Sequence, residues 1–413
     1  MPDIVFTGLC SVAFLLLKPG LAMGVYMFSL NLTVPNYEIR FVYLAICVFK
    51  FYYNGKRLNP HMFILTIGAV MLQLIDMTIF SQQGAVDVIY TVFKFLTYFF
   101  IPVFWYSDDY STEEYCSAMM CFVAGAVLGS GVILAMSVDT IGWEALLEGT
   151  NIRLGMNTTE INSGLNQMQT FYNANQLGIM LVLVITGIIV LMDRKYISKV
   201  LGIPLSAWLM FLVFLTKSRT AFLLLMGIAL AYYFILIARP KKVLRGTVFL
   251  VVALAILYAI ASFFPDVVED LTRRFEDESN STGGRDELFI DYISAWQENM
   301  WVMLFGYGII SYSEVVHLGN SPHNMIADIL ISWGAVGLVL TINTLVLMGH
   351  KGLQKVRDRE YFLVLLPAIV AILGDMAGQY LTVGYPHTRL CFFLLAAGAL
   401  SHEKEKRIST NRG

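Results

Sequence analysis

Residues 200–238 read VLGIPLSAWLMFLVFLTKSRTAFLLLMGIALAYYFILIA, two apolar runs separated by the polar residues Lys217-Ser218-Arg219-Thr220. Neither run, 200–216 or 220–238, holds a charged side chain, and each is long enough to cross the hydrocarbon core of a bilayer. The stretch therefore predicts two antiparallel membrane helices joined by a tight turn.

The rest of the chain continues this pattern. Of its 413 residues 57% are hydrophobic and 14% are charged, and the mean hydropathy is +0.67, which excludes a disordered chain and argues against a soluble enzyme. At about 20 residues for each crossing, this apolar content supplies roughly a dozen transmembrane helices. The predicted spans are 4–33, 39–53, 62–80, 86–105, 115–137, 176–192, 200–216, 220–238, 246–264, 325–349, 361–381 and 388–400. The sequence thus predicts an all-α, polytopic membrane helix bundle of about 12 transmembrane helices.

The first predicted span is too long for one straight crossing, and Lys18-Pro19-Gly20 interrupts it. A kinked helix is the first interpretation and a short hairpin the second. With one crossing there, the loops that would face the cytoplasm hold more than twice as many Lys and Arg residues as the opposite loops. Because cytoplasmic loops carry the excess of basic residues, both termini are predicted to be cytoplasmic.

The spans divide the chain into five parts. Residues 1–137 form about five N-terminal membrane helices, 138–175 form an outer Asn-rich loop, and 176–264 form the helices that carry the Ser218-Arg219 turn. Residues 265–324 form a large periplasmic loop with Arg285 and His323, and 325–413 form the C-terminal helices and a cytoplasmic tail. Within the large loop, residues 285–299 predict an amphipathic helix, because Leu288, Phe289, Tyr292, Ile293, Trp296 and Met300 recur at helical spacing. We expect this helix to rest on the bilayer surface or on the bundle.

Basic residues on the outer side are the first candidates for chemistry. Arg219 and Lys217 lie in the tight turn, and Arg285 follows two glycines at a helix start, where guanidinium and backbone N–H groups can together bind a phosphate. Arg273 and Arg274 lie among acidic residues of the same loop. The competing interpretations are a guanidinium that reaches the lipid headgroups, for Arg219, and solvated ion pairs, for Arg273 and Arg274.

Histidines and charges near the spans are the second group of candidates. His323, in Asn320-Ser321-Pro322-His323-Asn324, lies where the outer loop enters the next span, and an imidazole there can accept a hydroxyl proton near neutral pH. Asn324 is adjacent, and His387 and Arg389 form a second outer group. Lys94 lies inside a predicted span, where it could pair with Asp76 or serve a substrate, as intramembrane charges often do.

Several classes of function lack support. The net charge of −2 and the pI near 6.3 give no general attraction to nucleic acid. No Walker loop, HExxH or GxSxG motif occurs, and the five cysteines show no metal-ligand spacing, so we expect neither a metal nor another cofactor.

Short motifs between residues 170 and 340 resemble the O-antigen polymerase and O-antigen ligase superfamily. Thr216-Lys-Ser-Arg-Thr-Ala-Phe-Leu223 is similar to the Ser-Arg segment of that family. It is followed, in the order and spacing of the family, by four further motifs: Gly284-Arg-Asp-Glu-Leu288, Phe305-Gly-Tyr-Gly308, Ser321-Pro-His-Asn324 and Gly334-Ala-Val-Gly337. Upstream, Asn173-Ala-Asn175-Gln-Leu-Gly178 is similar to the Asn-rich entry to a span of that family.

This resemblance implies an inverting, metal-independent glycosyltransferase of the bacterial inner membrane with its site at the periplasmic face. Its substrate would be an oligosaccharide carried on undecaprenyl diphosphate. We expect His323, Arg219 and Arg285 to be catalytic, and Asn324, Arg273, Arg274, Lys217, Lys94, His387 and Arg389 to bind substrate. A diphosphate leaving group needs fixed cations, and the outer arginines and lysines can supply them.

The acceptor separates two functions. A polymerase transfers the glycan to a second lipid-linked repeat unit, and a ligase transfers it to the lipid A core. The acidic stretch 269–278 and the modest basic content outside favour the polymerase, because a phosphorylated core acceptor would be repelled there. A polysaccharide flippase or another secondary transporter is the alternative from a different class. By resemblance, the polymerase would work with a flippase and a chain-length regulator.

Overall fold

The computed structural model describes residues 2–17, short pieces between residues 21 and 74, and then 112–147, 152–155, 174–237, 243–276, 285–308, 316, 322, 324–353 and 359–376. All regular elements in these ranges are helices, as the sequence predicts. They are α1 (Pro2–Leu16), α6 (Thr112–Leu147), α8 (Ala174–Asp193), α9 (Lys199–Leu215), α10 (Arg219–Ile237), α11 (Val243–Phe263), α12 (Pro265–Glu276), α13 (Arg285–Gln297), α14 (Met300–Phe305), α16 (Met325–Leu353) and α17 (Arg359–Met376).

Four stretches of the described helices are long and apolar enough to cross a membrane: Tyr115–Leu147, Ala174–Asp193, Gly246–Phe263 and Met325–Asn343. Shorter apolar stretches lie at Lys199–Leu215, Arg219–Phe234 and Leu363–Met376. These helices and their composition identify a membrane protein. The predicted count of about 12 spans includes 86–105 and 388–400, which lie outside the described residues, as does the interruption at residues 18–20.

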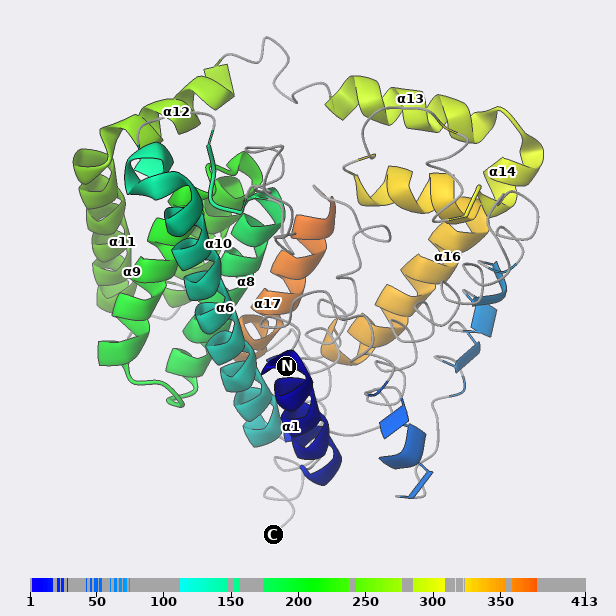
Figure 1. The fold of residues 1–413 in the computed structure, drawn as a ribbon, viewed down its shortest axis with the longest axis horizontal. Helices are drawn as coiled ribbons and strands as arrows, with labels where there is room; N and C mark the ends of the chain where they lie inside the picture. The colour runs from blue at the N-terminus through cyan, green and yellow to red at the C-terminus, as the bar shows by residue number, and fades with distance from the viewer. Residues whose placement is uncertain are drawn as a thin grey trace.

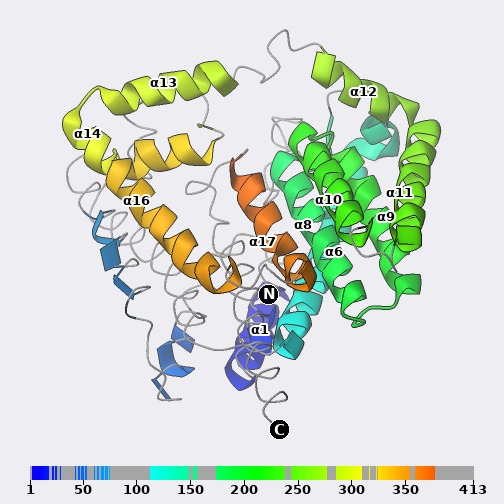
Figure 2. The ribbon, with the colours of Figure 1, turned by 180° about the vertical axis from the view of Figure 1, so that it is seen from behind.

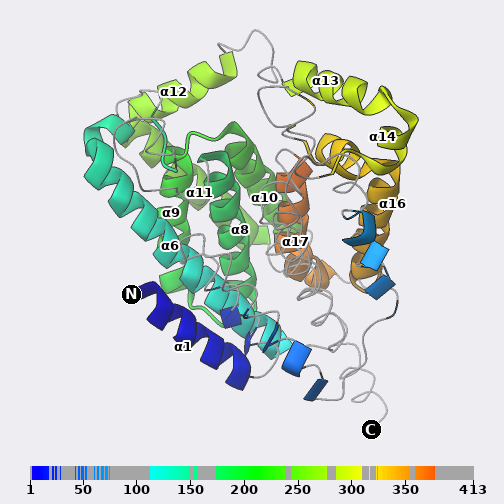
Figure 3. The same cartoon turned by 45° about the vertical axis from the view of Figure 1, so that its right-hand side comes forward.

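Helix α8 is the centre of the bundle. Nearly all of its residues from Leu177 to Leu191 are buried, which fits a helix that is apolar on every side. Helices α6, α9, α10 and α17 pack around it. Figures 1 and 2 show α17 between α8 and α16. Helix α1 lies beside α6 (Figures 1 and 3).

Helix α6 is longer than the predicted span. It continues past residue 137, where the outer loop was expected to begin, bends at Gly142 with φ 82°, and ends at Leu147. Asp139 and Thr140 lower the hydropathy of this part of the sequence, but Val138, Ile141 and Leu146 pack against the core cluster of the bundle. Tertiary packing therefore keeps helical a segment that composition alone assigns to a loop.

Two helices of the large loop lie across one end of the bundle. Figure 1 shows α12 over α9, α10 and α11, and α13 over the first turns of α16. The amphipathic helix predicted for residues 285–299 is α13, and it rests on the bundle: Tyr292 and Ala295 join Val302, Ala327 and Ile331 in one buried cluster. Helix α9 runs towards this end and α10 runs away from it, so the turn between them also lies here (Figure 1).

Candidate functional site

The turn between α9 and α10 is closed by its own hydrogen bonds. The Thr216 hydroxyl donates to the Val213 carbonyl at 2.7 Å, and the Lys217 amide donates to the Phe214 carbonyl at 2.8 Å. The Ser218 hydroxyl accepts from the Ala221 amide at 3.3 Å, in the manner of a helix N-cap, and α10 begins at Arg219. The sequence Thr-Lys-Ser-Arg thus ends one helix and starts the next without an intervening loop.

Lys217 is the unusual residue of this turn. Its φ of 48° lies in the left-handed region that non-glycine residues seldom adopt, and its side chain is only 1% exposed. Burying an ammonium group is costly unless charged or polar groups surround it. Strained backbone and a buried cation in one residue are typical of functional sites. Arg219, two residues on, is half-buried.

The start of α8 packs directly against this turn. A Cβ atom on Gly178 would lie 2.7 Å from the Ala221 Cβ and 2.9 Å from the Thr216 Oγ1, so only glycine allows this approach. The structure therefore brings together parts of two segments that the sequence singles out separately, residues 174–178 of the first and 216–223 of the second. On the other side, α17 touches α8: a Cβ on Gly374 would lie 2.5 Å from the Ile179 Cγ2, and the neighbouring Asp375 is buried.

A third segment, residues 152–155, also reaches this place. The Leu154 amide donates to the Leu215 carbonyl at 2.9 Å, at the end of α9, and the Leu154 side chain is fully buried. Gly155 lies against the start of α8, because a Cβ there would be 3.1 Å from Leu177 Cδ2 and 3.3 Å from Ala174 Cα. These contacts hold Arg153 next to the turn that carries Lys217 and Arg219.

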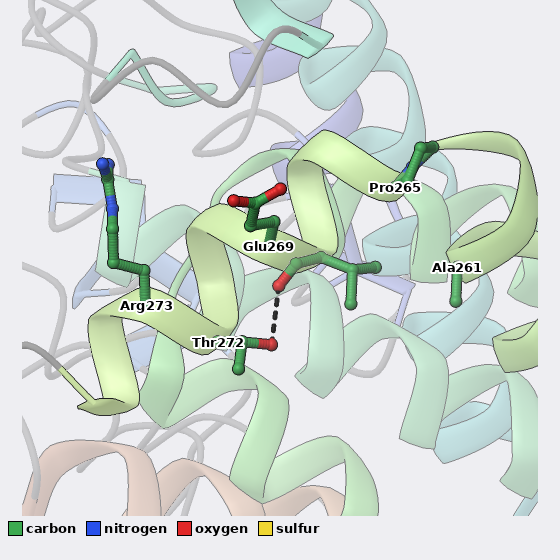
Figure 4. A pocket seen from close by; sticks show the side chains of 6 residues that line it. Ala261, Pro265, Glu269, Thr272 and Arg273 are labelled. Atoms are coloured by element: carbon green, nitrogen blue, oxygen red, sulfur yellow. Dashed lines mark hydrogen bonds between the residues drawn. The ribbon is translucent and has the colours of Figure 1, made fainter.

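Helix α12 covers the adjacent surface and carries Arg273. Its Val267 is buried with Phe214, and Phe222 packs against the same cluster, so α12 contacts both helices that flank the turn. Its outer side forms an open groove of about 530 Å³ lined by Ala261, Pro265, Val268, Glu269, Thr272 and Arg273. Figure 4 shows Glu269 and Arg273 extending from the same side of the helix, one turn apart.

Asn324 has a structural role at the start of α16. Its Oδ1 accepts hydrogen bonds from the amides of Ile326 at 2.8 Å and Ala327 at 3.2 Å, so it is the N-cap of that helix. Because Oδ1 is occupied by these two hydrogen bonds, the predicted role of Asn324 in holding the acceptor or the imidazole would fall to its Nδ2 group. One turn later, Asp328 is fully buried. On α13, burial of the Tyr292 phenol and, to a smaller extent, the negative charge of Asp328 raise the pKa of Tyr292 to about 12.

The glycine motifs at 305–308 and 334–337 meet where α14 crosses α16. Helix α16 bends at Gly334 with φ 64°, and the carbonyls freed at the bend accept from the amides of Tyr307 (to Ile331) and Gly308 (to Ser332), both at 2.8 Å. A Cβ on Gly306 or Gly334 would lie 2.4 Å from the backbone of the opposite segment. These motifs fasten the loop to the helix, and they make no phosphate-binding loop.

The predicted site residues therefore fall into four groups, one of which is Asn324 at the start of α16. Lys217 and Arg219 lie together in the turn, and Arg273 lies on α12 at the same end of the molecule. The side chains of Arg285, at the start of α13, and of Arg274 are outside the described residues, as are His323, Lys94, His387 and Arg389 entirely. The starts of α13 and α16 and the end of α17 all lie towards the middle of this end (Figures 1 and 2).

Arg153, which the structure places beside the turn, was not among the predicted site residues. It is the single basic residue of the segment 138–175, and its predicted place on the outer side opposes the positive-inside pattern. The unexpected basic residue could have marked Arg153 as a candidate, but nothing in the sequence indicates that Arg153 lies near residues 215–219.

Comparison with known proteins agrees with the motifs. Residues 204–342 match the model of a family described as O-antigen ligase. The matched segment includes the turn, α12 to α14 and the first half of α16, and so contains five of the six motifs noted in the sequence. No curated protein matches the chain. The match confirms the resemblance to the O-antigen polymerase and ligase superfamily and supports, in general terms, O-antigen polymerase or ligase activity of a membrane glycosyltransferase.

Proposed function

From its match to the O-antigen ligase family, we propose that the chain is a glycan polymerase of the bacterial inner membrane. It joins oligosaccharide repeat units carried on undecaprenyl diphosphate, for an O-antigen, a capsule or an exopolysaccharide, at the periplasmic face and with both of its termini in the cytoplasm. The observation that carries the proposal is the hydrogen-bonded turn with buried Lys217 and half-buried Arg219, packed on α8 at the end that α12 and α13 cover. Fixed cations suit a diphosphate leaving group.

Each predicted site residue has a role in the proposed reaction. The hydroxyl oxygen of the acceptor sugar attacks the anomeric carbon, and the bond from that carbon to the phosphate oxygen breaks with inversion. The electron pair stays on the departing lipid diphosphate, whose charge Arg219 and Arg285 neutralise, with Lys217, Arg273, Arg274 and Lys94 as further cations. His323 takes the hydroxyl proton, Asn324 supports it at the head of α16, and His387 and Arg389 contact the glycan.

The acceptor is a second lipid-linked repeat unit. Exposed carboxylates of α12, among them Asp266 and Glu269 beside the groove, would repel a heavily phosphorylated core acceptor. The description of the matching family favours the second candidate, an O-antigen ligase that transfers the glycan to the lipid A core. A flippase and a chain-length regulator are the proposed partners of the polymerase.

The test uses the purified full-length protein in detergent with a defined lipid-linked repeat unit and no ion gradient. A polymerase makes longer lipid-linked glycan from the repeat alone. Product that forms only after lipid A core is added identifies the ligase, and no product with either acceptor supports a transporter. His323→Ala should lower the rate by about 10²–10⁴-fold, as expected for loss of a positioned base. His350→Ala, at the other end of α16, is the matched control, and an unchanged rate in His323→Ala would refute the assigned base.

A further inference from the structure

The short helix α14 turns apolar side chains outward. Met300 is 76% exposed and Trp301 is 64% exposed, and Met303 and Leu304 are exposed as well. We call these four residues the apolar corner. Val302, on the inner side of α14, is fully buried in the cluster that α13 and α16 share. Exposed apolar side chains gathered in this way mark a contact surface rather than a surface that faces water.

The apolar corner is attached to a helix that can cross the membrane. Close backbone contacts fix α14 on α16, because a Cβ on Gly306 would lie 2.4 Å from the carbonyl carbon of Ser332 and from the amide nitrogen of Trp333. Both residues belong to Met325–Asn343, one of the stretches that are long and apolar enough to span a bilayer. Figures 1 and 2 show α14 at the outer edge of the molecule, beside α16. The apolar corner therefore lies next to a candidate span and is not carried on a loop away from it.

Exposed apolar residues continue from the apolar corner along α16. The Trp301 ring stacks on the Phe305 ring with centroids 5.7 Å apart, and Phe305 packs against the buried cluster of α16 that contains Trp333. Beyond the bend at Gly334, exposed apolar residues recur every three or four positions, which is the spacing of one helix face. They are Val336, Val339, Ile342 and Val346. Such a face of a membrane helix contacts lipid, and the apolar corner lies where this face begins.

The composition of the segment fits the boundary between acyl chains and headgroups. Residues 299–313 hold no charged side chain, although α12, in the same predicted loop, has charged residues in every turn. Tryptophan favours this boundary because its ring is apolar and its N–H group is polar. Exposed Glu298 and Asn299 precede the apolar corner and suit the headgroup side of the boundary. Among possible occupants, lipid therefore matches both the chemistry of this surface and its continuation along α16.

We propose that the apolar corner of α14 is inserted into the nearer leaflet of the bilayer, at the level where headgroups meet acyl chains. Its partner is the phospholipid of the membrane that the protein spans. Because Val302 shares a buried cluster with Tyr292 of α13 and Ile331 of α16, the same contact anchors α13 and the first turns of α16 at the membrane surface. The inference goes beyond the proposed function and needs only a protein that crosses the membrane.

The experiment measures quenching of tryptophan fluorescence in the full-length protein, reconstituted into phosphatidylcholine vesicles. The lipid carries bromine close to the headgroup or near the end of the acyl chain, and iodide on both sides of the membrane tests exposure to water. The signal of Trp301 is the difference between the wild type and Trp301→Phe, which keeps a ring against Phe305. Trp301→Leu should give the same difference. Trp208→Phe supplies the matched control, because Trp208 is 39% exposed midway along the apolar helix α9.

The Trp301 signal should be quenched most by bromine close to the headgroup and little by iodide, whereas the Trp208 signal should be quenched most by bromine near the chain end. Quenching of Trp301 by iodide but not by lipid would show that the apolar corner faces water, and the inference would be wrong. It would also be wrong if neither quencher acted on Trp301, since a second copy of the chain or another protein would then cover the corner. Stronger quenching of Trp301 by the deep bromine would place α14 in the hydrocarbon core and refute its place at the boundary. Glycan synthesis is not measured in this experiment, so none of these outcomes decides the proposed function.

Discussion

Gly334 of α16 and Leu304 of α14 lie backbone to backbone: a Cβ on Gly334 would be 2.4 Å from the Leu304 carbonyl carbon and oxygen. The positive φ of Gly334 and this contact both exclude a side chain. The crossing fixes α14 and the preceding α13 on the first turns of α16, and so determines where the start of α16 lies in relation to α13.

Replacing Gly334 with alanine should therefore destabilise the protein by more than about 1 kcal/mol, since strain at a special backbone conformation adds to a steric clash. Thermal unfolding in detergent, followed by tryptophan fluorescence, measures the loss. Gly227→Ala on α10 is the control, because nothing lies within 4 Å of its Cβ position, and alanine there should be neutral or slightly stabilising. Equal melting temperatures for the two variants would contradict the close crossing.

Lys217→Gly separates backbone strain from charge. Glycine accepts the φ of 48° at no steric cost, so Lys217→Gly should unfold at a higher temperature than Lys217→Ala, which removes the same buried ammonium group but keeps the strained backbone. Glycan synthesis by Lys217→Gly should nevertheless fall by at least about tenfold, as expected when a charged contact is lost. A Lys217→Gly protein that polymerises at the wild-type rate would show that the lysine has no part in the reaction.

Gly178→Ala should displace the turn from α8. The new Cβ would approach the Ala221 Cβ to 2.7 Å, so the variant should lose both stability and activity. The double variant Gly178→Ala/Ala221→Gly removes one of the two close contacts and should recover part of each. A double-mutant cycle on the melting temperature measures the coupling, and strictly additive effects would mean that the two positions do not touch.

Tyr292 makes stability depend on pH at the alkaline end. Its pKa in the folded protein is raised to about 12, above the ordinary value of 10.0, so between these values the folded state holds a proton that the unfolded state releases. The free energy of unfolding should therefore fall as the pH rises from 10 to 12. Tyr292→Phe should weaken this dependence, and absorbance titration of tyrosinate should lose the ionisation near pH 12. An unchanged titration would refute the raised pKa.

The apolar helices between residues 174 and 263 could be predicted well, because their ends are set by local composition. The predicted spans 176–192, 200–216, 220–238 and 246–264 differ by only a few residues from α8 to α11, since charged or polar residues bound each apolar run. The end of α6 was predicted too early, because its last turns are held by contacts with the core and by no local signal.

The candidate site was predictable only in part. Lys217 and Arg219 could be identified because a charged turn between two apolar runs is visible in the sequence. Arg153 could not be placed beside them, because its position depends on contacts between residues far apart in the chain, the hydrogen bond of Leu154 to Leu215 and the packing of Gly155 on α8. The glycines at 306 and 334 were visible as motifs, but the contact between them depends on the fold.

The bend at Gly334 has a mechanical consequence. The amides of Tyr307 and Gly308 bond to carbonyls that precede the bend, so α13, α14 and the part of α16 from Asn324 to Trp333 are joined as one unit, and the remainder of α16 continues in another direction beyond the bend. The structure thereby couples the backbone of Arg285, at the start of α13, to that of Asn324, at the start of α16.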